Sequence, residues 1–358
     1  MIVKKSNIIT GLDIGSSKVA AVAAEIDSSG LFKILAQVTQ PSKGVSKGAI
    51  TDLNAAINSV SSVLSKLRDK TSKRCENIYV NVSGQSVKGA RSRGMVPLAL
   101  RGREVRKADM AKCIEAASTI HLPFDREIIH KIVHRYSIDD QSWIKSPLGL
   151  YASRLSCEVY IITAGVTHIQ NIYKCVNDSG YDISQLVFTG IADAAGILDK
   201  AELEDGVVLV DMGDSLTEVS MYLSGKLSEL DIIPFGAKDI KGDFKDDTEF
   251  NNVISRIASR CEDFLKTPGK IRSVTLTGGL AFTDGLIEYL ETKLPYPIKM
   301  GIVRDIRGDI SSLDSVRLTT ALGLAKYAYG IYEKKMAEVK NLPQNLSAKI
   351  VDIFNNYF

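Results

Sequence analysis

The chain contains the same short motif twice, and this duplication constrains its fold more than any other feature. Near the start, an apolar run (9–12) leads into Asp13-Ile14-Gly15-Ser16-Ser17-Lys18, and a second apolar run follows. In the second half, another apolar run (208–210) leads into Asp211-Met212-Gly213-Asp214-Ser215, and 216–220 follow. Each copy is typical of a buried strand, a tight turn and a returning strand. The backbone N–H groups and hydroxyls of such a turn form a concave anion site.

A P-loop is a poor alternative for the first copy. That motif requires Gly-x-x-x-x-Gly-Lys-Ser/Thr before a helix, whereas Lys18 here follows the hydroxyls and precedes the β-branched and small residues 19–22. Taken alone, the first copy is also compatible with an ordinary hairpin. The second copy favours a duplicated binding element instead.

Composition indicates an ordinary soluble protein with two domains. The chain has 358 residues, of which 45% are hydrophobic and 24% charged, and its net charge of +3 gives no argument for nucleic acid. The five cysteines are scattered without a Cys-x-x-Cys pair, which favours a reducing compartment over disulfides or a thiolate metal site. We expect no signal peptide, because the motif strand follows Met1-Ile2-Val3-Lys4-Lys5 at once, and no membrane-spanning segment, because no apolar run approaches 18 residues.

Hydrophobic periodicity predicts alternating strands and helices, as in mixed α/β domains. We expect Asp52 to cap the first helix, the basic stretch 89–94 to be flexible, and the charged stretch 238–249 to be a solvated loop. The predicted strands are 9–14, 19–22, 31–38, 78–82, 125–134, 153–162, 184–188 and 273–277, besides the second hairpin. The predicted helices are 53–67, 107–118, 166–178, 190–198, 252–265, 284–294 and 318–332.

A third glycine turn, Thr277-Gly278-Gly279, ends an apolar strand and precedes a helix. Two phosphate-gripping hairpins and a glycine turn, in this order, resemble the nucleotide clamp of actin, the Hsp70 chaperones and hexokinase. Three unrelated tight turns are the less specific alternative. The resemblance implies that Asp13 and Asp211 face the phosphates across a cleft and hold Mg²⁺ through water, because Mg²⁺ gives up its water reluctantly.

A longer run of residues is more specific. The sequences Asp125-Arg126-Glu127-Ile128-Ile129-His130, Asp139-Asp140-Gln141, Ile144-Lys145-Ser146-Pro147-Leu148-Gly149-Leu150 and Arg154-Leu155 resemble a segment characteristic of the bacterial division protein family FtsA. The resemblance covers nearly the whole chain. It implies an actin-like two-domain α/β fold with duplicated RNase H-like halves and an inserted α+β subdomain. The implied domains are 1A (1–86 with 164–197), 1C (87–163), 2A (198–332), a linker (333–345) and a C-terminal amphipathic helix (346–358).

The resemblance also implies the residues that touch ATP. They are Asp13, Gly15, Ser16, Ser17, Lys18, Asp211, Gly213, Asp214, Ser215, Gly236, Gly278 and Gly279, with Asp13 and Asp211 toward Mg²⁺.

The second motif departs from the family in ways that weaken this site. Asp214, Ser215 and Leu216 stand where the family has glycines and a threonine, Gly236-Ala237 replaces a double glycine, and Thr189-Gly190 replaces a Glu-Pro. A carboxylate opposes a triphosphate, and each lost glycine restricts access to the backbone. The short spacing from Asp211 to Gly278 further implies that subdomain 2B, which forms an adenine wall and docks the FtsZ tail, is absent or reduced. We expect ATP binding with little or no hydrolysis and assign no catalytic residue.

The C-terminal segment 346–358 is amphipathic. Its apolar positions recur at spacings of three and four, which suits a helix in a lipid headgroup region. They are Leu346, Ile350, Ile353, Phe354, Tyr357 and Phe358. A helix docked on its own domain is the alternative, because Lys349 and Asp352 cancel and a basic face is missing.

The resemblance therefore implies a polymerising division protein on the cytoplasmic side of the cell membrane, at the division site. Its implied partners are copies of itself, FtsZ, later division proteins through 1C, and lipids through the C-terminal helix, but no nucleic acid. Two alternatives remain: a scaffold of a pilus or secretion assembly resembling PilM, and a small-molecule kinase with the same clamp. A kinase requires a well-formed γ-phosphate site, which Asp214 and Leu216 degrade.

Overall fold

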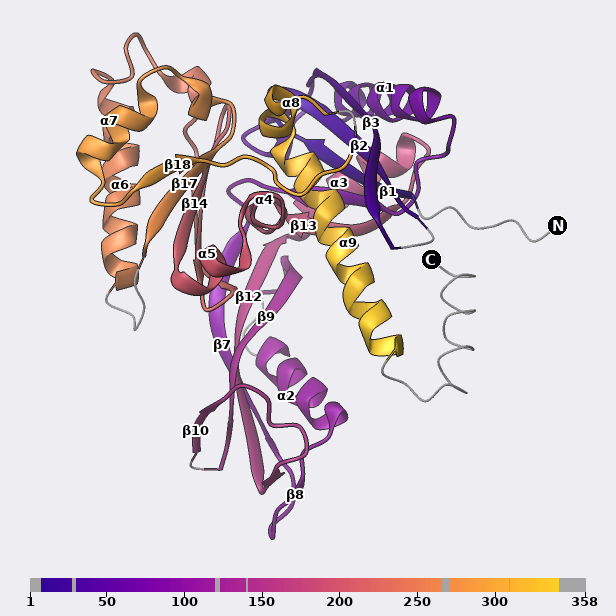
Figure 1. The fold of residues 1–358 in the computed structure, drawn as a ribbon, viewed down its shortest axis with the longest axis vertical. Helices are drawn as coiled ribbons and strands as arrows, with labels where there is room; N and C mark the ends of the chain where they lie inside the picture. Colours follow the sequence, from indigo (N-terminus) through magenta and orange to yellow (C-terminus); the bar gives the residue numbers. More distant parts are fainter. Residues whose placement is uncertain are drawn as a thin grey trace, which may run out of the picture.

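Two five-stranded sheets with matching strand order form the body of the molecule (Figure 1). A computed structural model describes residues 8–27, 30–119, 123–139, 141–265, 271–308 and 310–340. Three antiparallel strands are followed in each sheet by two parallel strands, in the orders β3-β2-β1-β6-β13 and β16-β15-β14-β17-β18. The first sheet comprises β1 (Ile8–Ile14), β2 (Lys18–Ile26), β3 (Phe32–Pro41), β6 (Ile78–Val82) and β13 (Ile183–Phe188). The second comprises β14 (Val207–Met212), β15 (Thr217–Leu223), β16 (Lys226–Ile233), β17 (Ser273–Thr277) and β18 (Ile298–Met300). The predicted duplicated actin-like α/β fold is confirmed.

Helices cover both sheets and fill the space between them. α1 packs on β2 and β3, and Asp52 caps it as predicted, its Oδ1 accepting from Ala55 N at 3.1 Å. α4 and α9 pack against each other in the middle of the molecule, with α9 also against β1 (Figure 1). These helices are α1 (Leu53–Thr71), α3 (Val166–Asp178), α4 (Thr189–Ile197), α6 (Thr248–Leu265), α7 (Leu286–Lys293) and α9 (Thr319–Lys340).

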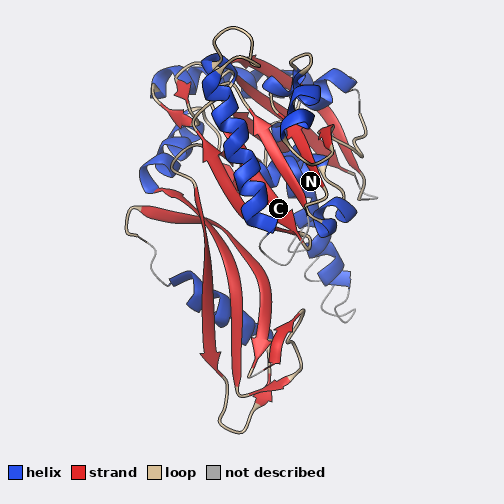
Figure 2. Ribbon diagram, turned by 90° about the vertical axis from the view of Figure 1, so that its left-hand side faces the viewer, coloured by secondary structure: helices blue, strands red, loops and turns tan. Residues whose placement is uncertain are grey.

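A third, four-stranded sheet projects from this body (Figure 2). Its order is β10-β9-β12-β7, and α2 packs on β7 and β12. The expectation of a flexible stretch at 89–94 was wrong, because these residues lie within β7 and pair with Cys157 to Ile162 of β12. Small residues in β7 permit close packing rather than flexibility: a Cβ on Gly94 would lie 2.2 Å from the carbonyl oxygen of Cys113 in α2. The elements are β7 (Lys88–Pro97), α2 (Lys107–Thr119), β9 (Arg126–Ile138), β10 (Gln141–Ile144) and β12 (Arg154–Gly165), with a small pair β8 (Arg103–Glu104) and β11 (Tyr151–Ala152).

The structure differs from two expectations, one for the stretch 238–249 and one for the linker 333–345. The stretch 238–249 is not simply a solvated loop: Phe244 is buried, and Asp247 caps α6 by accepting from Phe250 N at 2.8 Å. α9 continues to Lys340, so the described part of the expected linker 333–345 is helical. The short elements are β4 (Val45–Ser46), β5 (Ala49–Ile50), α5 (Lys200–Asp205), η1 (Ala237–Asp239), η2 (Leu280–Phe282) and α8 (Ser312–Arg317).

The predicted amphipathic helix 346–358 lies outside the described residues. Within the part of the chain that the structure describes, no helix is both long and apolar enough to cross a membrane.

Candidate functional site

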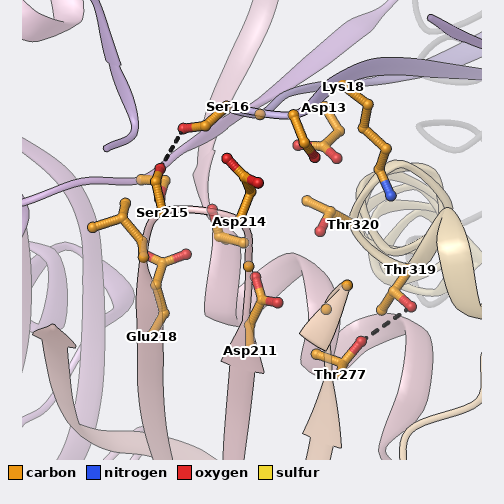
Figure 3. A pocket seen from close by; sticks show the side chains of 18 of the residues that line it. Asp13, Ser16, Lys18, Asp211, Asp214, Ser215, Glu218, Thr277, Thr319 and Thr320 are labelled. Carbon is orange, nitrogen blue, oxygen red and sulfur yellow. Dashed lines mark hydrogen bonds between the residues drawn. The ribbon is translucent and has the colours of Figure 1, made fainter. Parts of the chain in front are cut away.

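A cavity of about 520 Å³ lies between the two halves, where the two Asp-x-Gly hairpins face each other (Figure 3). Its volume is within the range of small-molecule sites. Eleven of the twelve residues expected to touch nucleotide line it: Asp13, Gly15, Ser16, Ser17, Lys18, Asp211, Gly213, Asp214, Ser215, Gly278 and Gly279. Gly236 does not line it and instead supports the second hairpin from behind. The structure thus brings together three motifs that are far apart in the sequence.

The first hairpin holds Asp13 through a residue that the sequence did not single out. Asp13 lies near the end of β1, and the turn closes with Gly15 N donating to the carbonyl oxygen of Lys18 at 3.0 Å. Asn81, from β6, donates its Nδ2 to Asp13 Oδ1 at 2.9 Å, while its own Oδ1 accepts from Ile14 N at 2.8 Å. Because Asn81 uses both ends of its amide, it fixes the orientation of the carboxylate.

The two hairpins touch each other directly. The Ser215 hydroxyl donates to Ser16 Oγ at 2.7 Å (Figure 3). Lys47 N donates to Ser215 Oγ at 3.1 Å. Gly236 is required behind this contact, because a Cβ there would lie 2.4 Å from the backbone nitrogen of Ser215. Serine hydroxyls that would grip phosphates are therefore paired with each other across the cleft.

The third motif forms another wall of the cavity. Gly278 has φ +88°, and a Cβ on it would lie 2.2 Å from Asp211 Oδ1, so this position requires glycine. A Cβ on the next residue, Gly279, would meet no atom of the described chain within 4 Å. Thr277 Oγ1 donates to Thr319 Oγ1 at 3.2 Å and so ties this strand to the start of α9. The wall beside Gly279 consequently leaves room for a flat group against the backbone.

Acidic groups dominate the cavity. Four carboxylates line it (Asp13, Asp211, Asp214 and Glu218), against the two cations Lys18 and Arg317 within the described parts of the chain. The Lys18 ammonium donates to the carbonyl oxygen of Arg317. Burial raises the pKa of Asp13 to about 6, although the charge of Lys18 opposes this shift. Burial and the neighbouring Asp13 raise the pKa of Asp211 to about 6.

The deepest carboxyls are shifted further. Burial and the charge of Asp211 raise the pKa of Glu218 to about 8. Asp193 of α4 is fully buried behind the cavity, and burial together with Asp211 raises its pKa well above the ordinary value. The site thus carries protons or a cation at neutral pH, because so many carboxylates cannot all ionise together at low cost.

This donor set fits a triphosphate only when a divalent cation accompanies it. Among the described residues, no group of three or more His, Cys, Asp or Glu side chains is arranged to hold a metal ion alone. A cation held jointly by Asp13, Asp211, waters and phosphate oxygens fits this arrangement, since Mg²⁺ is usually bound through few carboxylates and several waters. Ser16, Ser17 and the glycine turns would meet the phosphates, and the open wall at Gly279 would meet a base.

Sequence reasoning missed Asn81, Glu218 and Thr319. Asn81 was visible as the single polar residue inside the apolar strand 78–82. Glu218 was visible as a charge in the returning strand of the second hairpin, directly opposite Asp211 in the ladder. No local pattern indicated Thr319, which reaches the site only because α9 packs against the strands.

Comparison with known proteins agrees with this architecture. Residues 84–163 match the family model described as the SHS2 domain inserted in FtsA. The chain is 28% identical to the cell division protein FtsA of Borreliella burgdorferi, over 96% of this chain and 95% of that protein. It is 25% identical to FtsA of Pseudomonas aeruginosa, over 91% of this chain and 90% of that protein.

Solved structures show the same fold at low identity. The chain resembles a structure titled PilM-PilN type IV pilus biogenesis complex, with a TM-score of 0.65 and 15% identity, over 90% of this chain and 98% of that one. It also resembles the ethanolamine utilization protein EutJ from Carboxydothermus hydrogenoformans, with a TM-score of 0.50 and 14% identity, over 89% of each chain. The SHS2 insertion, the actin-like fold and the near full-length similarity to FtsA proteins together support the predicted resemblance of the chain to FtsA, an actin-like cell division protein.

Proposed function

We propose that this division protein binds ATP together with Mg²⁺ in the cleft between its two halves. The observation that carries the proposal is the cavity itself, with two matching hairpins, a glycine wall and carboxylates on both sides. Asp13 and Asp211 would hold the hydrated cation. The hydroxyls of Ser16 and Ser17 would contact the phosphates.

Binding would be weak for two reasons. Asp214 lies in the middle of the cavity in Figure 3, where its carboxylate would repel a triphosphate. Entry of phosphates would also break the Ser16–Ser215 hydrogen bond. These two features support weakened ATP binding.

We further propose that the 2B subdomain is absent or reduced. β16 ends at Ile233 and α6 begins at Thr248, and the chain between them forms η1 and the turn capped by Asp247. This short connection supports the proposal. Docking of FtsZ would then use a surface other than 2B.

The remaining proposals concern the membrane and the partners. The protein would attach to the inner face of the cell membrane through 346–358, form filaments with copies of itself, and recruit later division proteins through 87–163. Support comes from the amphipathic pattern of the tail and from the projecting third sheet.

Calorimetric titration with Mg-ATP tests the nucleotide site. We expect a dissociation constant weaker than about 1 µM. Asp13→Asn should weaken binding and remove its dependence on Mg²⁺, while Asp182→Asn, an exposed aspartate outside the cleft, should change neither. Absence of binding at millimolar Mg-ATP would overturn the proposed site, and submicromolar affinity would overturn the proposed weakening.

Sedimentation with vesicles containing anionic phosphatidylglycerol tests the tail. The full chain should sediment with the vesicles, and a chain lacking 346–358 should stay in solution. Equal sedimentation of the two proteins would rule out the tail as the anchor.

A further inference from the structure

The outer end of the third sheet carries a cluster of exposed apolar side chains. This end, which we call the tip, consists of residues 98–107 and 147–151 and lies around β8 in Figure 1; the structure describes both stretches throughout. Large apolar side chains that gather on one part of a surface usually mark a contact with a protein or a membrane. Four such side chains of the tip are exposed, the first of them completely: Leu100, Leu148, Leu150 and Tyr151.

Backbone hydrogen bonds hold the two stretches of the tip together. β8 pairs with β11, and Tyr151 lies opposite Glu104 in this ladder. Val105 N donates to the carbonyl oxygen of Leu150 at 2.8 Å, and Gly149 N donates to that of Val105 at 3.0 Å. Because the backbone is fixed in this way, the fold itself holds the apolar side chains in solvent.

The charges of the tip favour an anionic partner. Glu104 is the exposed carboxylate of the two stretches. Asp109, in the first turn of α2, is buried and accepts two hydrogen bonds of 2.7 Å from Arg103, so these two charges cancel. Asp139, which follows β9, turns its carboxylate to the backbone N–H groups of 153–154. The exposed cations of the tip exceed its exposed carboxylate: Arg101, Arg106 and Lys107.

The tip projects toward the side of the molecule to which the proposed membrane anchor leads. Figure 1 shows the third sheet extending from the body and α9 running toward that same side. α9 ends at Lys340, and only the residues 341–345 separate it from the amphipathic segment 346–358. A bilayer held by this segment would thus lie on the side to which the tip projects.

We infer that the tip is a second lipid-binding element, which buries Leu100 and its apolar neighbours in the headgroup region of an anionic bilayer. The apolar side chains leave water there, and the cations meet lipid phosphates. A protein partner fits less well, because a stable protein interface needs roughly 800 Å² on each side, whereas the tip is the narrow end of a projecting sheet (Figure 2). Lipid binding by the tip presupposes the proposed attachment through 346–358, since two weak contacts in one chain reinforce each other and the tip alone is too weak to hold the chain.

A fluorescent label on the full-length chain tests insertion directly. The five native cysteines are buried, so the polarity-sensitive dye NBD should react selectively with Leu100→Cys. Vesicles containing phosphatidylglycerol should raise its emission and shift it to shorter wavelength, and quenchers attached to the lipid acyl chains should reduce it. The same dye on Asn54→Cys, an exposed position of α1 at the opposite end of the molecule, should not respond (Figure 1). Unchanged emission from Leu100→Cys while the protein sediments with the vesicles overturns the inference.

Substitutions measure how much the tip contributes. The double variant Leu100→Ser with Tyr151→Ser should bind phosphatidylglycerol vesicles about tenfold more weakly in sedimentation, because withdrawing apolar side chains from water contributes factors of this size. Leu100→Trp should bind at least as tightly as the wild type, since tryptophan favours the membrane interface. Phe124→Ser is the matched control: Phe124 is fully exposed but lies just before β9, at the end of the sheet next to the body, and its loss should leave binding unchanged.

Failure of the tip is distinguishable from failure of the proposed anchor. Equal binding of the double variant and the wild type overturns only the lipid contact of the tip and points to a protein contact there instead. Equal binding of the wild type to vesicles of phosphatidylcholine alone would contradict the role of the cations. If the chain lacking 346–358 sediments as well as the full chain, the anchor fails, and the Leu100→Cys label in that shortened chain still tests the tip. Absence of vesicle binding by the full chain overturns both proposals.

Discussion

Replacing Glu218 by glutamine should stabilise the nucleotide-free protein, by an amount that grows with pH. The pKa of this carboxyl is about 8 in the folded chain, against an ordinary value of 4.5. Because the folded state holds the proton more tightly, this group favours folding most below pH 4.5. That contribution is lost as the pH rises toward 8. Glutamine keeps the shape of the side chain but has no charge to bury.

The magnitude follows from the size of the shift. One pKa unit corresponds to about 1.4 kcal/mol, so ionising Glu218 costs the wild type about 4 kcal/mol between pH 5 and pH 8. The burial of Asp13 and Asp211 themselves is common to both proteins and cancels in the comparison, whereas their repulsion of Glu218 is part of the pKa shift and is absent from the variant. The free energy of unfolding of Glu218→Gln should thus exceed that of the wild type by about 1.4 kcal/mol more for each pH unit in this window, and the difference should stay constant above it.

Urea unfolding of both proteins at unit steps from pH 5 to pH 9 measures this difference. Glu291→Gln, an exposed glutamate of α7, is the matched control and should follow the wild type at every pH. A constant difference between Glu218→Gln and the wild type across the whole range would refute the reasoning, because it would mean that Glu218 titrates alike in the folded and unfolded chains.

Three further substitutions test other parts of the structure. Asn81→Ala leaves Ile14 N–H and the Asp13 carboxylate without their partner and should cost about 2 to 4 kcal/mol in thermal or urea unfolding; a loss below about 0.5 kcal/mol would contradict the clamp. Asp214→Asn should tighten Mg-ATP binding by about 1 to 2 kcal/mol, or five- to thirtyfold by calorimetry, and unchanged affinity would show that this carboxylate does not face the phosphates. Gly94→Val should displace α2 from the third sheet at a cost of roughly 1 to 3 kcal/mol, detectable as faster hydrogen exchange in α2, and unchanged exchange would contradict the packing.

Much of the fold could be predicted because its signals are local. The apolar runs around Asp13 and Asp211 each give a strand, a turn and a returning strand, and periodicity placed α1 and α3 within a few residues of their ends. β7 was missed because its strand conformation is not a property of its own residues. Glycines, serines and arginines become a strand there only because β12 pairs with it and α2 covers it.

The candidate site also combines features that the local sequence determines with features that only the tertiary packing creates. The sequence alone determined the two hairpins, the glycine turn and the carboxylates Asp13 and Asp211, because turn chemistry and charge are local properties. Only the tertiary structure decided that Ser215 bonds Ser16, that Asn81 clamps Asp13, and that Glu218 is buried beside Asp211 with one oxygen unpaired. The raised pKa values follow from the same packing, since desolvation and charge repulsion depend on which carboxylates the fold buries together.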